Sequence, residues 1–199
     1  MSYVSVGLLA TLWCVFAASS WSKARSRPAL RAFADSLRPL PLLAARLVGP
    51  VAVLVTIAEL VLVLGITWSV LAMAAGWPAA RPGGILVLVL ALLLLAVLTT
   101  GVILAVRRDI GARCACFGAT QQPLSWRHVV RNALLLAVTA AALVTVAVAQ
   151  THPLSVAGVL ISVAAGSVGA LILVRLDDLV ELFLPTPSAP LARPARRRP

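Results

Sequence analysis

Two cysteines separated by a single residue, Cys114 and Cys116, have the clearest chemical potential in this sequence. A disulfide between them would close a small, strained ring, and strained disulfides are reduced more easily than bracing ones. Nearby arginines favour the thiolate, which is the nucleophile in disulfide exchange, and Gly118 permits a sharp turn beside the pair. The pattern indicates thiol–disulfide exchange. A soft-metal site for Cu(I), or two small semi-buried residues at a helix end, are the alternatives.

Glu59 is the one ionisable residue deep inside an apolar segment. A carboxylate near the centre of a bilayer is costly and usually faces the interior of a helix bundle. Because we find no basic side chain at the same depth in the other apolar segments, the expected state is a neutral, protonated acid. Such a group could relay a proton or hold a polar ligand such as a quinone carbonyl. The alternative is a structural hydrogen bond to Thr56 or to a polar group on another helix.

Three further residues are candidates of lower specificity. His128 lies at the start of an apolar segment, where it anchors the helix at the interface or handles protons beside the cysteines. Asn132, one turn later, is placed to hydrogen-bond across helices or to the cysteine segment. Cys14 is expected to be a small buried hydrophobe rather than a third redox thiol. With three cysteines and two histidines in the chain, neither a disulfide framework nor a classical zinc site is predicted.

The elements that carry these residues are predicted to be transmembrane helices. Apolar residues make up 61% of the 199 residues and charged residues only 12%. A helix needs about 20 apolar residues to cross a hydrocarbon core of about 30 Å. Segments of this kind cover residues 3–20, 47–75, 85–106, 129–149 and 154–174. The expected fold is an all-α, polytopic transmembrane helix bundle of four core helices plus a fifth, spanning residues 1–176, followed by a disordered Pro/Arg-rich tail at 177–199.

The first apolar segment is predicted to be a retained helix rather than a signal peptide. No Lys or Arg precedes it, and a dense basic segment follows, which is the opposite of a signal peptide's charge bias. That basic segment, residues 21–46, contains prolines that exclude one continuous helix. A short interfacial helix at about residues 29–37 is expected there, with its apolar side resting on the membrane.

Basic residues are distributed very unevenly between the two sides of the predicted bundle. One side holds sixteen Lys or Arg and the other holds only Arg81. The positive-inside rule therefore predicts an outside N-terminus and a cytoplasmic C-terminus. The net charge of +11 is assigned to topology and to anionic lipid headgroups, so a nucleic-acid partner is not expected.

With these residues placed, the chain resembles the MauE family of methylamine-utilisation membrane proteins, which are related in general design to DoxX-like proteins. The resemblance rests on Ser22-Lys23 after the first span, Glu59 in the second, the run Cys114-Ala115-Cys116-Phe117-Gly118, and Arg131-Asn132 at the start of the penultimate span. It covers roughly residues 3–150. It implies thiol–disulfide electron transfer that supports maturation of methylamine dehydrogenase alongside a thioredoxin-like partner.

Two features depart from what the resemblance implies. Ala115 stands where glycine is expected, which stiffens the loop. The charge distribution puts the cysteines on the cytoplasmic side, whereas maturation of the dehydrogenase takes place outside. Two other functions stay open, a non-enzymatic membrane assembly subunit and a small-solute carrier that uses Glu59.

Overall fold

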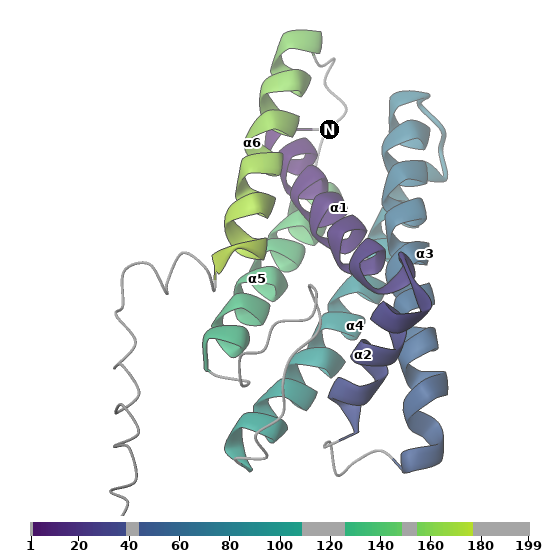
Figure 1. Ribbon diagram of the computed structural model, residues 1–199. Helices are drawn as coiled ribbons and strands as arrows, with labels where there is room; N and C mark the ends of the chain where they lie inside the picture. Colours follow the sequence, from purple (N-terminus) through teal and green to yellow (C-terminus); the bar gives the residue numbers. More distant parts are fainter. Residues whose placement is uncertain (1, 39–43, 109–125, 149–154, 177–199) are drawn as a thin grey trace, which may run out of the picture.

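Five helices of the computed structural model are long and apolar enough to cross a membrane (Figure 1). The structure describes residues 2–38, 44–108, 126–148 and 155–176, and within these ranges it contains helices and no strand. This confirms the predicted all-α, multi-pass bundle. The spanning helices are α1 (Tyr3–Ala24), α3 (Val48–Ala74), α4 (Ala80–Arg107), α5 (Trp126–Val148) and α6 (Val156–Val174), and a short helix α2 (Arg27–Leu37) and a 3-10 turn η1 (Ala45–Leu47) lie between α1 and α3.

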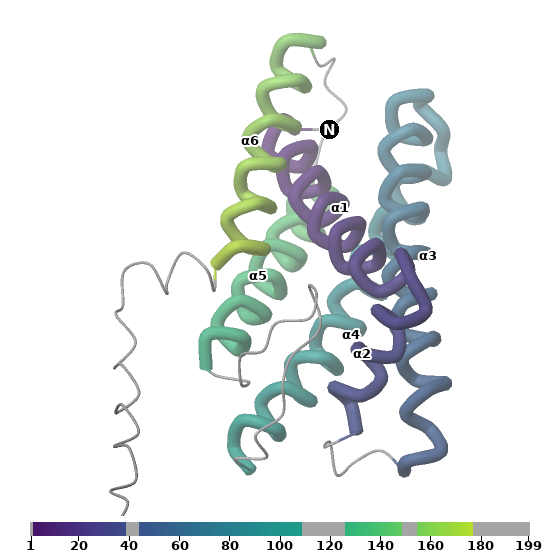
Figure 2. Tube along the Cα trace, in the orientation of Figure 1, coloured from purple at the N-terminus to yellow at the C-terminus, as the bar shows by residue number. Residues whose placement is uncertain are grey.

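Successive spanning helices run in opposite directions, as the tube in Figure 2 shows. The start of α1, the turn between α3 and α4 and the start of α6 therefore lie towards one end of the bundle, called here the turn end. The other end, called the connector end, holds α2, the start of α3, the end of α4 at Arg107 and the start of α5 at Trp126.

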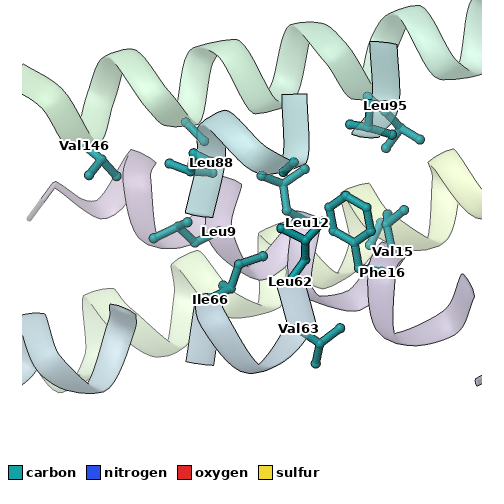
Figure 3. Close-up of a cluster of buried hydrophobic side chains, with 14 residues drawn as sticks. Leu9, Leu12, Val15, Phe16, Leu62, Val63, Ile66, Leu88, Leu95 and Val146 are labelled. Atoms are coloured by element: carbon teal, nitrogen blue, oxygen red, sulfur yellow. The ribbon is translucent and has the colours of Figure 1, made fainter. Parts of the chain in front are cut away.

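The hydrophobic core is built around α1, which packs against α2, α3, α5 and α6. Leu12 and Phe16 of α1 belong to one cluster of buried side chains with residues of α3 and α4 (Figure 3). Burial of these side chains is compatible with a membrane protein because close packing, rather than exclusion from water, holds helices together in lipid. The labelled core residues are Leu9, Leu12, Val15, Phe16, Leu62, Val63, Ile66, Leu88, Leu95 and Val146.

Helix α2 agrees in position with the predicted interfacial helix, but its apolar side does not rest on the membrane. Phe33 is 1% exposed, and α2 packs against α1 and α3. The helix starts at the N-cap Ser26, whose hydroxyl accepts a hydrogen bond from the Ala29 N–H, and Pro28 is tolerated in the first turn. The sequence expectation is wrong here because an amphipathic period identifies an apolar side without identifying what covers it.

Helix α4 begins at Ala80, ahead of the apolar segment predicted from residue 85, and therefore includes Pro82, Gly83 and Gly84. Proline in the first helical turn loses no hydrogen bond. Gly83 is a packing residue, because a Cβ at this position would collide with the Trp68 ring of α3. The two helices therefore approach closely where the sequence alone suggested a loop.

Helix α6 is held on α1 by small residues that recur at every fourth position, Gly158, Ser162 and Gly166. A Cβ at Gly166 would collide with the Gly7 carbonyl oxygen of α1. The Thr11 hydroxyl donates a hydrogen bond of 3.0 Å to the Gly166 carbonyl oxygen. This close approach of two backbones is a typical way of packing helices in lipid.

We expect Gly166→Ala to destabilise the bundle, because the added methyl group must push two backbones apart at a cost of about 1–3 kcal/mol. Gly101→Ala in α4 is the matched control, since a Cβ there meets no atom within 4 Å. Thermal midpoints of the two variants, measured by size-exclusion chromatography of heated, detergent-solubilised protein, should fall only for Gly166→Ala. Equal midpoints for both would contradict the close α1–α6 packing.

Candidate functional site

Lys23 and Glu59 form an ion pair inside the bundle. The Lys23 Nζ atom lies 2.6 Å from Glu59 Oε1 and 2.7 Å from Oε2. The Ser19 hydroxyl donates a 3.0 Å hydrogen bond to Oε1 and accepts one of 2.7 Å from Lys23 Nζ. Lys23 is 1% exposed and Glu59 is 3% exposed. The ammonium, hydroxyl and carboxylate groups thus form a closed set of charge-assisted hydrogen bonds.

Three helices position this cluster. Ser19 and Lys23 are four residues apart on α1, so they share one face, and α1 ends just after Lys23 at Ala24. Glu59 comes eleven residues after Val48, or about 16 Å along α3, which is near the middle of the span. The Phe33 ring of α2 covers the ammonium, with Nζ 4.8 Å from the ring centroid. This cation–π contact closes the remaining side of the cation.

The expectation that no basic side chain reaches the depth of Glu59 is wrong. The apolar segment at residues 3–20 predicts a first helix that ends near Ser20, with Lys23 in the basic connector that follows it. In the structure α1 continues to Ala24 and stops at the level of Glu59, so Lys23 lies within the bundle. Thr56 is not the partner of Glu59, because its hydroxyl donates to the Ala52 carbonyl of its own helix at 2.8 Å.

A second polar group lies in the first turns of α5. His128, Arg131 and Asn132 are buried on one face of the helix, and the same face continues with Leu135 and Thr139 into the core. The sequence alone predicts His128 at the membrane interface, and it gives Arg131 no role beyond its positive charge and its part in the family resemblance. Steps of three or four residues separate His128, Arg131, Leu135 and Thr139, which is the spacing of a single helix face. This spacing is the sequence signal that places His128 and Arg131 on the interior face.

The buried charges and the hydrophobic core occupy opposite halves of the bundle. On α1 the core residues precede Ser19 and Lys23, whereas on α3 they follow Glu59 and on α5 they follow Asn132. Because α1 runs opposite to α3 and α5, all of these polar residues lie towards the connector end (Figure 1). The bundle therefore has an apolar half at the turn end and a polar half at the connector end.

The predicted cysteine pair lies outside the described residues, as does Gly118. Both belong to the segment 109–125, which joins the end of α4 at Arg107 to the start of α5 at Trp126, at the polar half of the bundle. Cys14 is described, and its Sγ atom lies 3.8 Å from the Ser167 hydroxyl on α6. Cys14 is thus part of the α1–α6 packing. The predicted tail at 177–199 also falls outside the described residues.

Residues 1–147 match the model of the family described as Methylamine utilisation protein MauE. The chain belongs to the MauE family. The match includes every residue on which the sequence resemblance was based, and it ends within α5, so helix α6 lies beyond the family match. No curated protein and no solved structure matches the chain. In this MauE-family chain, the fold brings two residues of the sequence resemblance together, because Lys23 near the end of α1 pairs with Glu59 of α3.

Removing one partner of the ion pair should cost far more stability than removing both. Lys23→Met and Glu59→Leu each leave a buried charge without its counter-ion, a loss of about 3–5 kcal/mol, whereas the double variant Lys23→Met/Glu59→Leu should recover most of it. Glu59→Gln should also destabilise, since the amide cannot neutralise Lys23. Thermal midpoints in detergent measure these effects.

The control for this series is Asp35→Asn, which breaks the exposed Asp35–Arg38 pair of 3.0 Å. We expect the control to change stability by no more than about 1 kcal/mol, because exposed pairs contribute little. A Glu59→Gln variant as stable as the wild type would show that the carboxyl group is protonated and that the pair is not ionic.

Proposed function

We propose that this membrane protein takes part in thiol–disulfide electron transfer through Cys114 and Cys116, in support of the maturation of a partner protein. Membership of the MauE family ties the chain to methylamine utilisation. The observation that supports the proposal is that α4 ends and α5 begins, on either side of the two-cysteine segment, at the polar half of the bundle. A reactive dithiol joined to that half lies at the end of the bundle that holds its buried ionisable side chains, whereas the buried polar side chains described towards the turn end are uncharged serines and threonines.

The proposed exchange transfers two electrons. The thiolate of one cysteine attacks a disulfide of the partner, a mixed disulfide forms, and the second cysteine displaces the partner as a dithiol. This leaves a Cys114–Cys116 disulfide, and the two protons lost from the cysteines balance the two gained by the partner's thiols. The reverse direction uses the same steps. A thioredoxin-like protein is the proposed partner. In the reverse direction the partner's dithiol reduces the Cys114–Cys116 disulfide, and a membrane quinone is then a candidate acceptor for the two electrons that re-oxidise the resulting dithiol.

The described ends of the segment favour the thiolate form. Arg107 and Arg108 at the end of α4 are exposed, and positive charge near a cysteine favours its thiolate. His128, in the first turn of α5, is the proposed proton carrier for the thiols. Asn132 is proposed to hold the segment by hydrogen bonding, and Gly118 to give its backbone the freedom to turn.

Glu59 is proposed as a positioning residue for this function. Its Oε1 atom accepts hydrogen bonds from Lys23 and Ser19, and its Oε2 atom accepts one from Lys23. A transported solute or a quinone carbonyl would have to displace Lys23 to reach the carboxylate, which does not favour the small-solute carrier. The assembly-subunit alternative is compatible with the same contacts, because a rigid bundle could hold a partner without exchange chemistry.

The orientation that we propose places the N-terminus outside, and the connector end and the C-terminal tail in the cytoplasm. Lys23 and Arg131 are buried, so they do not contact headgroups, but the exposed Arg46, Arg107 and Arg108 lie at the same end. Arg81 lies at the turn end. The uneven distribution of positive charge therefore persists when buried residues are left out.

Cys114→Ser and Cys116→Ser should each abolish exchange, and one of them should trap a mixed disulfide with a thioredoxin-like partner. Non-reducing electrophoresis after acid quenching and thiol alkylation measures both the redox state and the trapped species. Cys14→Ala is the control and should be close to silent, because Cys14 packs against α6. Full function in both serine variants would instead favour the assembly subunit.

A membrane-impermeant maleimide should reach Ala79→Cys in intact cells, whereas Ala44→Cys should react only after permeabilisation. Both positions are exposed, they lie at opposite ends of the bundle, and neither change alters the charge distribution. Each is placed in a background without native cysteines. Labelling of Ala44→Cys in sealed cells would reverse the proposed orientation.

A further inference from the structure

Helix α1 ends inside the depth range of the membrane rather than at its surface. Its last turn carries Lys23, and the ammonium meets Glu59 about 16 Å along α3 from Val48. The chain then turns at Arg25 and Ser26, and α2 runs back beside the first half of α3 (Figure 1). The eleven residues of α2 rise by about 16 Å, which is nearly the distance from Glu59 back to the start of α3.

The outer face of α2 is basic at this depth. Arg27 and Arg31 are four residues apart and exposed, so they lie on the same face, and exposed Arg25 precedes them. Asp35, on the same face, is already paired with Arg38 at 3.0 Å. Within the described part of the chain, no carboxylate lies within ion-pair distance of Arg27 or Arg31.

The surface of α3 at the same level is apolar. Val53, Leu54 and Ile57 precede Glu59 on α3, and their exposed fractions are 42%, 66% and 52%. Side chains of this kind face hydrocarbon in a membrane. Guanidinium groups at the level of lipid-facing aliphatic residues need an anion or water, because a charged side chain in hydrocarbon is costly.

We infer that Arg27 and Arg31 bind the phosphate of an anionic phospholipid whose acyl chains lie on the exposed face of α3. An amphiphile supplies both kinds of contact, a phosphate that accepts hydrogen bonds from the guanidinium groups and aliphatic chains that run on past Ile57 over Val61 and Leu64, the exposed residues that continue the same face of α3 deeper into the span. A soluble acidic peptide would satisfy the arginines but not the apolar surface. Buried Phe33 packs against the Lys23 ammonium and so anchors α2, which keeps Arg27 and Arg31 on the exposed face of that helix. The site is independent of the cysteine chemistry.

Native mass spectrometry of the full chain in detergent tests this site by titration with phosphatidylglycerol and with phosphatidylcholine. The wild type should bind phosphatidylglycerol more tightly than phosphatidylcholine. Arg27→Gln/Arg31→Gln should weaken the binding of phosphatidylglycerol by roughly tenfold and leave the binding of phosphatidylcholine unchanged. Arg107→Gln/Arg108→Gln is the control that removes the same charge from another exposed place at the connector end, and it should change binding by less than about twofold.

Three further measurements keep the test decisive. Arg27→Lys/Arg31→Lys should retain the preference, because it keeps the charge, and excess inorganic phosphate should not displace the lipid, because the acyl chains contribute to binding. Arg31→Gln alone should give an intermediate loss if the double variant does not fold.

Several results would overturn the assignment. These are equal affinity of the wild type for the two lipids, equal loss in both glutamine double variants, or displacement by inorganic phosphate. The assignment would also fail if a second protein, bound to the wild type in a fixed ratio, were lost from Arg27→Gln/Arg31→Gln while lipid binding persisted.

Discussion

The ion pair between Lys23 and Glu59 is the interaction on which the arrangement of the connector end depends. A single charge at this depth would be strongly unfavourable, and two opposite charges are tolerated only when they meet with good geometry. To bring its ammonium to Glu59, α1 has to end about halfway along α3, one residue after Lys23. The position of α2 follows, because the chain must return to the surface from that depth and Phe33 covers the ammonium on the way.

This constraint divides the bundle into two halves that are stabilised in different ways. Towards the turn end, leucine, isoleucine and valine side chains of four helices interdigitate (Figure 3), and dispersion between closely packed atoms holds them. Towards the connector end, charge-assisted hydrogen bonds hold α1 to α3, and α5 presents His128, Arg131 and Asn132. Helix α6, which lies beyond the family match, adds to α1 through glycine and serine without touching the ion pair. The polar half is thus built from the region that the family shares.

Sequence reasoning could find the spans but not their relative depths. Apolar length identifies a membrane helix from composition alone, and an acid such as Glu59 is conspicuous inside one. The end of α1 is different, because the partners that Ser19 and Lys23 meet inside the bundle, Glu59 and Phe33, come from other helices. The local sequence there resembles an ordinary helix end. Gly83 was similarly ambiguous, since a glycine that permits a turn also permits contact with an aromatic ring such as that of Trp68. Contacts between helices decide both cases, and these contacts cannot be derived from a single sequence.

The ion pair, which carries no net charge, also limits what Glu59 can contribute to the proposed chemistry at the cysteines. An ammonium and a carboxylate 2.6 Å apart have a field that falls off faster than that of either charge alone, because the two contributions largely cancel at a distance. The pair can therefore fix the position of helices without setting the potential at the connector end. A potential that favours a thiolate has to come from charges that are not cancelled in this way, such as those of the exposed Arg107 and Arg108. Geometry and electrostatics are thus supplied by different residues, so a change that preserves the neutrality of the pair should alter the alignment of the helices before it alters the acidity of the thiols.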